Sequence, residues 1–168
     1  GGFGGQSPVP GQRRFINDAD RYVRILEKLH SACRDHPLRK LGISPHSLRA
    51  VTAELLREII AELDRLDTKS PIHIHIAEQV AAVAEVQTAW GARPVEWAVA
   101  NLALDGRWCM IHATQMTPDE TASLARTGAV AGLCPITEAN LGDGIFDGPG
   151  WLAATGAFGV GTDSNVRI

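Results

Sequence analysis

The sequence predicts an α/β protein built on a parallel sheet. Strand-like segments alternate with helix-like segments along the chain, and in α/β proteins this alternation places successive strands parallel to one another. About five strands can be counted within the 168 residues. A closed eight-stranded barrel of alternating strands and helices needs roughly 250 residues, so the chain would supply little more than half of such a barrel.

The first part of the chain is expected to contain a loop and two helices. Its first 16 residues are rich in Gly and Pro, which predicts a loop. A helix capped by Asn17 or Asp18 is predicted to run to about Leu29. A short apolar segment follows at Leu41–Ile43, and apolar residues then recur every three or four positions over Leu48–Leu63, which is the strongest helical pattern of the sequence.

The second part begins with a clear strand signal. The strict alternation of Pro71–Ala77 predicts a strand with isoleucines on one face and His73 and His75 on the other. The later elements are predicted as a helix from about Glu78 to Trp90, a helix from Pro94 to about Leu102, a strand Trp108–Ala113, a helix from a capping box at Thr117 to Gly128, and strands Ala129–Cys134 and Ala157–Thr162 separated by a Gly/Asp-rich loop.

Composition excludes several classes of protein. The formal net charge is −3 and basic residues form no block, so binding to a phosphate backbone has no electrostatic support. Apolar runs stay shorter than the roughly 18 residues of a membrane span. Three cysteines without CxxC spacing argue against a disulfide framework or a zinc knuckle. We therefore expect a cytoplasmic protein that acts on a small molecule, without nucleic-acid or membrane partners.

Polar side chains gather where the predicted strands end. His46, His75, Glu78, His112 and Asp163 all lie at or just after the carboxyl ends of predicted strands, and in a parallel α/β barrel that rim carries the active site. A single histidine at a strand end is more often a structural residue with a hydrogen-bond partner. Because such positions recur on consecutive strand–helix units, the sequence favours a site, and we expect these side chains to converge at one rim of the sheet.

The residue types indicate metal-assisted hydrolysis. His75 lies nearer the rim than His73, so His75 is the better metal ligand and His73 is expected to pack one layer deeper. Glu78 lies on the turn that leaves the strand and could reach a water; its alternative role is to favour the start of the next helix. Asp163 ends a glycine-rich strand whose small residues allow close approach. Its carboxylate could bind a metal and accept a proton, or it could simply cap a helix.

A second group of side chains suggests how an anion is bound. His46 and Arg49 are predicted one helical turn apart at a helix start, which would form a corner that binds a carboxylate. A solvated arginine beside a capping histidine is an equal alternative. Cys109 and Cys134 are predicted to lie in the core of apolar strands, and the absence of a Gly-x-Ser-x-Gly elbow leaves a serine hydrolase without support.

Six segments carry recognisable motifs: Gly11–Phe15, Pro45–Val51, His73–Gln79, Ile111–Thr114, Leu133–Gly144 and Gly161–Asn165. These motifs resemble those of the amidohydrolase superfamily and, more narrowly, of the formimidoylglutamate deiminases of histidine breakdown. The similarity extends over nearly the whole chain.

This resemblance implies a metal-dependent (β/α)8 barrel with a small flanking β domain. Residues 1–168 would be the C-terminal part of the barrel, roughly strands four to eight, with the N-terminal strands and the β domain outside the chain. One divalent ion, usually zinc, would have His75 and Asp163 as two of its four ligands, and the other two would lie upstream of Gly1.

The activity that the resemblance implies is the hydrolysis of N-formimino-L-glutamate to N-formyl-L-glutamate and ammonia. Asp163 would take a proton from water, Glu78 would carry protons to the substrate nitrogen, and His112 would stabilise charge on the attacking oxygen. His46 and Arg49 would bind the substrate carboxylates. The alternatives are a deaminase of a cyclic amidine such as a nucleobase, and a non-catalytic fragment. The segment alone is not expected to be active, and a homodimer is left open.

Overall fold

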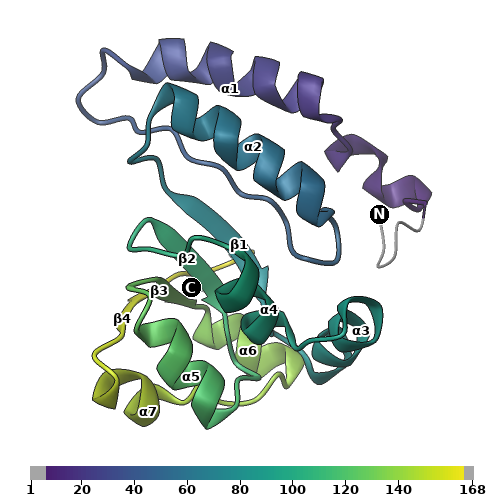
Figure 1. The fold of residues 1–168 in the computed structure, drawn as a ribbon, viewed down its shortest axis with the longest axis vertical. Coiled ribbons are helices and arrows are strands. Elements are labelled where there is room, and N and C mark those ends of the chain that lie inside the picture. The colour runs from purple at the N-terminus through teal and green to yellow at the C-terminus, as the bar shows by residue number, and fades with distance from the viewer. Residues whose placement is uncertain (1–6, 165–168) are drawn as a thin grey trace. The chain divides into compact units, whose positions relative to one another are not determined.

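The computed structural model describes residues 7–164 of the chain (Figure 1). These residues belong to two compact units that divide between Ile72 and His73, and each unit is described by itself. Within the described residues, the helices are too short or too polar to cross a membrane. The predicted Gly-rich loop over residues 1–5 and the motif residue Asn165 lie outside the described residues.

The N-terminal unit begins with a short helical turn and a long helix. The 3₁₀ helix η2 (Pro10–Phe15) occupies part of the expected loop, because a proline at its first position is compatible with a helical start. Helix α1 (Ala19–Cys33) begins after Asp18, whose carboxylate accepts a hydrogen bond from the Arg21 amide at 2.7 Å, as the cap prediction required. The helix continues one turn beyond the predicted end at Leu29.

Helix α2 (Ala53–Leu66) starts later than the apolar pattern predicted. Its N-cap is Thr52, whose hydroxyl accepts a hydrogen bond from the Leu55 amide at 3.2 Å. The preceding residues form a turn, yet Leu48 in that turn is buried. The spacing of apolar residues therefore predicted the burial of Leu48 correctly. The helix begins only after its N-cap residue, Thr52.

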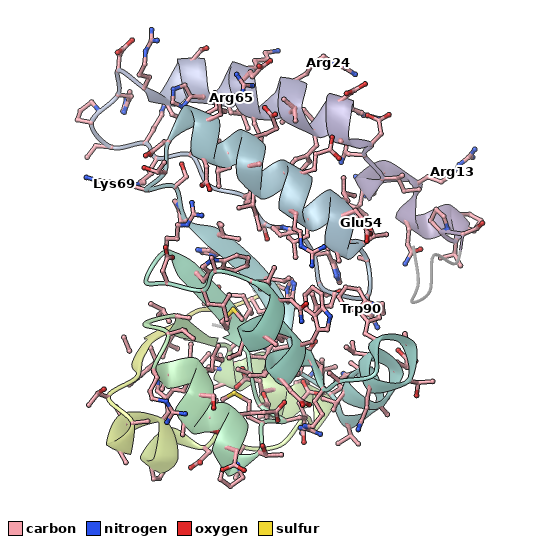
Figure 2. All side chains as sticks on the ribbon, viewed as in Figure 1. Arg13, Arg24, Glu54, Arg65, Lys69 and Trp90 are labelled. Atoms are coloured by element: carbon pink, nitrogen blue, oxygen red, sulfur yellow. The ribbon has the colours of Figure 1, made fainter. Side chains whose placement is uncertain are left out.

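Helices α1 and α2 lie side by side within the N-terminal unit (Figure 1). Helix α2 buries Leu56, Ile59 and Leu63 along one face, and α1 buries Leu26. The guanidinium group of Arg65 of α2, a residue labelled in Figure 2, lies 2.6 Å from the Glu62 carboxylate and 3.5 Å from that of Glu27 of α1. Exposed ion pairs add little to stability, so the apolar stripe is what holds the two helices together.

The sheet has four strands in the order β1 (Ile72–Ile76), β2 (Trp108–His112), β3 (Val130–Leu133) and β4 (Ala157–Val160). The β2–β3 and β3–β4 ladders are both parallel. Within the N-terminal unit, an isolated parallel bridge joins Ile43 to Ile72, at the short apolar segment expected around Leu41–Ile43. The predicted α/β fold with a parallel sheet is therefore confirmed.

Three helices of the C-terminal unit agree with the sequence pattern. Helix α3 (Val80–Trp90) ends at Gly91, whose φ of 74° is the left-handed conformation that glycine tolerates. Helix α4 (Pro94–Asn101) begins at the predicted proline. Helix α5 (Pro118–Ala125) has the predicted capping box, in which the Thr117 hydroxyl accepts from the Glu120 amide and the Glu120 carboxylate accepts from the Thr117 amide.

The prediction of a loop between the last two strands is wrong in part. It contains two short helices, α6 (Pro135–Leu141) and α7 (Gly148–Ala153). Each has a proline in its first turn, and Asp147 caps α7 by accepting a hydrogen bond from the Gly150 amide at 3.0 Å. The Gly and Asp residues that suggested a loop include Gly142 at the end of α6 and Asp147 at the start of α7. Helices of six or seven residues leave no periodic pattern to detect.

The core of the C-terminal unit lies between the sheet and its helices. Its largest fully buried side chains include Trp108 and Met110 of β2, Leu124 of α5 and Trp151 of α7. Trp151 also donates its indole N–H to the carbonyl oxygen of Ala157 at 3.0 Å, which joins α7 to the start of β4. Strand β4 itself is exposed along its length.

Candidate functional site

Three strand ends share an unusual backbone conformation. The φ angle is 46° at Ala77 after β1, 70° at His112 at the end of β2, and 53° at Asp163 after β4. Residues other than glycine rarely adopt positive φ, and such residues persist where the surrounding structure holds them. The strained positions therefore coincide with the strand ends at which the sequence placed its candidate site residues.

His112 lies at the centre of a cluster of titratable side chains. Its side chain is 1% exposed, and its Nε2 lies 3.6 Å from Oε1 of Glu78. Its Nδ1 lies 3.2 Å from Oε1 of Glu138. The ring of His75 stacks on that of His112, with 5.6 Å between ring centroids and 28° between the planes. One imidazole thus connects the ends of β1 and β2 with helix α6.

Glu78 lies on the turn between β1 and α3, as expected, one residue before the helix cap. Burial raises the pKa of its carboxyl group above the ordinary value; the charges of Asp143 and Asp163 raise it further, while those of His112 and His75 oppose the shift. A carboxyl group with a raised pKa can carry a proton closer to neutral pH. The position and the environment of Glu78 therefore suit proton transfer.

Three residues of the cluster were not singled out as site residues from the sequence. Glu138 and Asp143 are buried, with 5% and 6% exposure, and Cys134 is buried beside them. The prediction that Cys134 lies in a strand is wrong. Cys134 is the N-cap of α6, directly after β3. Burial, together with the charges of Asp163 and Glu138 among others, raises the pKa of Cys134 to about 11. The available signal was the motif Leu133–Gly144, which contains both Glu138 and Asp143.

The structure brings His75, Glu78 and His112 together, as the sequence suggested. Asp163 lies on an exposed turn after β4, and its charge acts on both Glu78 and Cys134. His73 is exposed, so the expectation that it packs in a deeper layer is wrong. Around Gly159, no described atom lies within 4 Å of the position of a Cβ, so the expected close approach is not found there.

His46 and Arg49 belong to the N-terminal unit. They lie on a turn before Thr52 rather than at a helix start, so the helix dipole does not contribute to anion binding there. Both side chains are exposed, and Nδ1 of His46 lies 2.9 Å from the Ser47 hydroxyl. Their role in substrate binding stays a prediction.

The donor atoms around His112 fit a cation. Carboxylates outnumber histidines in the cluster, and Oδ2 of the buried Asp143 has no hydrogen-bond partner among the described residues. An imidazole and a carboxylate, as in His75 and Asp163, are ligand types that zinc accepts. The electrostatics therefore favour a bound cation at the strand ends.

A second donor set lies beside the first. One ligand atom each of His112, Cys134 and Glu138 lies within 4.8 Å of the others. However, Oε1 of Glu138 already accepts a hydrogen bond from the Cys134 amide at 2.8 Å and contacts His112. A thiol with a pKa of about 11 is protonated near neutral pH. We therefore interpret this set as a hydrogen-bonded pair of side chains, His112 and Glu138, to which Cys134 contributes its backbone amide.

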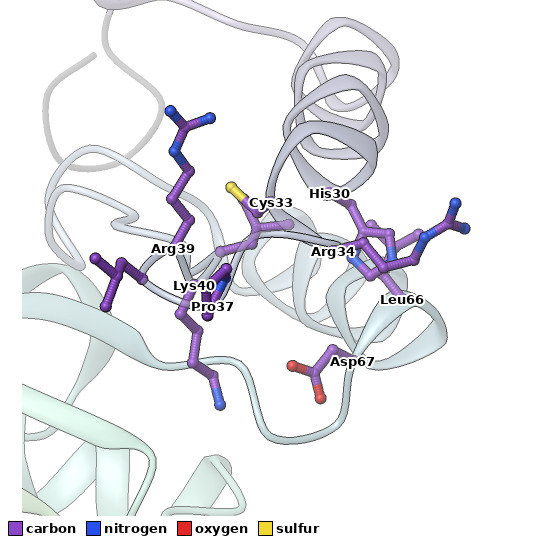
Figure 3. A pocket seen from close by; sticks show the side chains of 10 residues that line it. His30, Cys33, Arg34, Pro37, Arg39, Lys40, Leu66 and Asp67 are labelled. Atoms are coloured by element: carbon purple, nitrogen blue, oxygen red, sulfur yellow. The ribbon is translucent and has the colours of Figure 1, made fainter.

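A pocket in the N-terminal unit is separate from this chemistry. It has a volume of about 740 Å³ and is lined by the end of α1, the end of α2 and the segment that follows α1 (Figure 3). Arg34, Arg39 and Lys40 make its lining basic, and Asp67 adds a carboxylate (Figure 3). The predicted site residues do not line this pocket.

Comparison with known proteins identifies relatives that match nearly the whole chain. The chain is 48% identical over 99% of its length to formimidoylglutamate deiminase from Pseudomonas aeruginosa, and it spans 36% of that protein. It is similar to the crystal structure of an amidohydrolase from Brucella melitensis, with 48% identity, a TM-score of 0.92, and coverage of 99% of this chain and 36% of that one.

A more distant structure is an adenosine deaminase from Xanthomonas campestris with bound zinc. It is 26% identical, with a TM-score of 0.78, and the match covers 85% of this chain and 32% of that one. The chain thus spans about a third of the length of its relatives. The amidohydrolase family model matches residues 2–168. This match, over nearly the whole chain, shows that the chain belongs to the amidohydrolase family, whose partial barrel the four-stranded parallel sheet is consistent with.

Proposed function

We propose that the protein hydrolyses N-formimino-L-glutamate to N-formyl-L-glutamate and ammonia. The observation that carries this proposal is the 48% identity to a formimidoylglutamate deiminase over 99% of the chain. The geometry supports the same class of reaction, because Glu78 and His112 place a carboxyl group and an imidazole 3.6 Å apart beside His75. Such a pair can move protons while water attacks an amidine carbon.

The reaction needs one C–O bond to form and one C–N bond to break. Water adds to the imino carbon, and its two protons must leave the oxygen so that a formyl group remains. We assign Asp163 as the acceptor of the first proton and Glu78 as the group that delivers protons to the nitrogen that leaves as ammonia. Nε2 of His112 would face the attacking oxygen and stabilise the charge that develops there.

His75 and Asp163 are the residues that would hold a divalent ion, zinc being the ion found in a related structure. Such an ion lowers the pKa of water and so makes attack possible near neutral pH. Elemental analysis tests this assignment: His75→Ala in the complete protein should lose most of its metal, whereas Arg65→Ala, which removes two surface ion pairs, should keep it. Equal metal content in the two variants would refute the role of His75.

His46 and Arg49 would bind the carboxylates of the substrate. A guanidinium group matches a carboxylate with two parallel hydrogen bonds, and both side chains are exposed in the segment before Thr52. The substrate is a small anion, and we place the enzyme in the cytoplasm and in histidine breakdown.

A second candidate is the deamination of a nucleoside or nucleobase. The similarity to an adenosine deaminase favours it, since adenine also carries an amidine carbon that water attacks. Ammonia release distinguishes the two proposals: the complete protein should release ammonia from N-formimino-L-glutamate much faster than from adenosine. The reverse preference would replace the first proposal by the second.

A further inference from the structure

We propose that Glu138 is a positioning residue that holds the imidazole of His112 in the tautomer and orientation presenting Nε2 to the reacting atoms. Glu138 lies on α6 and is 5% exposed. Its Oε1 lies 3.2 Å from Nδ1 of His112 and accepts the Cys134 amide hydrogen at 2.8 Å. Only the kinetic part of this inference rests on the proposed hydrolysis.

Glu138 is more deeply buried than a residue that caps a helix start needs to be. A buried carboxylate is costly unless hydrogen bonds compensate for its lost water. Other helices of the chain are capped by exposed side chains, such as Thr52, Thr117 and Asp147. Capping the amide of Cys134 therefore does not by itself explain why a carboxylate is buried against His112.

The contact determines which ring nitrogen carries a proton. Oε1 of Glu138 already accepts the Cys134 amide hydrogen and so acts as an acceptor at this contact; we therefore assign the ring proton to Nδ1 of His112, which donates it to Glu138. Nε2 is then the atom that faces Glu78, at 3.6 Å. With Nδ1 engaged, any proton that His112 takes up or releases during a reaction is exchanged at Nε2.

Both partners of this contact are held in place. His112 is the last residue of β2, has φ of 70°, and stacks on His75. The carbonyl oxygen of Glu138 accepts the Asp143 amide hydrogen at 2.9 Å, and the side chain of Gln115 donates to the Asp143 carbonyl. Helix α6 is thereby tied to the loop that follows β2, so the carboxylate cannot easily move away from the ring.

Kinetics with three variants of the complete protein test the proposal. Glu138→Ala removes the acceptor and should lower kcat by about 10- to 100-fold, the usual cost of losing a group that orients a site histidine, with KM changed less than about threefold. Glu138→Gln keeps an acceptor oxygen at the same reach and should recover most of that loss. Asp147→Ala removes a cap on neighbouring α7 and should lower the melting temperature without lowering kcat.

A spectroscopic measurement tests the orientation without an assay. ¹⁵N NMR of histidine-labelled protein, with the His112 signal identified by its loss in His112→Gln, should show a proton on Nδ1 in the wild type. In Glu138→Ala the proton should move to Nε2 in a substantial fraction of molecules. If Glu138→Ala does not fold, Glu138→Asp replaces it, because its carboxylate is one methylene too short to reach Nδ1.

Each outcome decides the proposal. Unchanged kcat in Glu138→Ala, an unprotonated Nδ1 in the wild type, or Glu138→Asp matching Glu138→Gln would overturn it. Loss of metal in Glu138→Ala in proportion to the loss of kcat would also overturn it and would make Glu138 a ligand, together with His112 and Cys134. Failure of the proposed function looks different: the wild type would then leave N-formimino-L-glutamate intact while the NMR result stands.

Discussion

Oε1 of Glu138 and Nδ1 of His112 lie 3.2 Å apart, while the other nitrogen of the same ring lies 3.6 Å from Glu78. One imidazole therefore bridges two carboxylates that come from different parts of the chain. Glu78 lies on the turn that follows β1, and Glu138 lies on α6, 60 residues later in the sequence. Their convergence on His112 makes this side chain the organising element of the site.

The first prediction concerns Glu78. Replacing it in the complete protein by Gln removes the group that carries protons, so kcat should fall by about 10²- to 10⁴-fold, the usual contribution of a general acid or base. Metal content should not change, because Glu78 is not assigned as a ligand. Steady-state kinetics and elemental analysis measure both quantities. Glu85→Gln, on the exposed surface of α3, is the matched control; a Glu78→Gln enzyme as active as this control would exclude proton transfer by Glu78.

The second prediction concerns Arg49. If its guanidinium binds a substrate carboxylate, Arg49→Met should lower kcat/KM for N-formimino-L-glutamate by roughly 10²-fold, as expected for the loss of a charge-assisted hydrogen bond of about 1.5–3 kcal/mol. Formamidine lacks a carboxylate, so its slow hydrolysis should be the same for both proteins. Ammonia release on the two substrates gives the comparison. An equal loss on both substrates would instead indicate a structural role for Arg49.

The third prediction concerns the pH dependence of thiol reactivity. Because its pKa is raised to about 11, Cys134 stays protonated near neutral pH, and its alkylation by iodoacetamide should become about tenfold faster for each unit of rising pH below that value. Partly exposed Cys33 serves as the internal reference. Mass spectrometry at pH 8 should find Cys33 labelled and Cys134 unlabelled. Glu138→Gln should speed the labelling of Cys134, since it removes one of the charges that raise this pKa.

The fourth prediction concerns packing within the sheet. A Cβ on Gly132 would lie 2.6 Å from Cδ1 of Ile111 and 2.8 Å from Sγ of Cys109, so Gly132→Ala should lower the free energy of unfolding by about 1–3 kcal/mol. Gly159, on the adjacent strand, has open space at the same position among the described residues. Gly159→Ala should therefore cost much less. Urea denaturation of both variants measures the difference, and equal stability would contradict the packing argument.

The sequence predicted the parts of the fold that depend on local patterns. Alternating isoleucines predicted β1, and the capping box at Thr117 predicted α5, because these signals lie within a few residues of one another. The start of α2 was placed too early, since Leu48 is buried without being helical. Helices α6 and α7 are too short for periodicity, so they could not be distinguished from a loop.

The candidate site shows the same limit. His75, Glu78 and His112 were found because each ends a strand, and parallel strands bring such positions to one edge. Glu138 and Asp143 were not predicted as site residues, because what places them in the site is their burial near His112 and Glu78. A carboxylate on a short helix has no local pattern that marks it as buried, so tertiary structure was needed to find it.

Product analysis in ¹⁸O-labelled water tests the central claim most directly. The complete protein, incubated with N-formimino-L-glutamate in H₂¹⁸O, should release one ammonia per N-formyl-L-glutamate, with the label in the formyl oxygen, because water attacks the imino carbon and the terminal nitrogen leaves. Mass spectrometry of the product measures this incorporation. Formation of glutamate and formamide would mean that the other C–N bond breaks, and unconverted substrate beside a rapidly deaminated nucleoside would contradict the proposed activity.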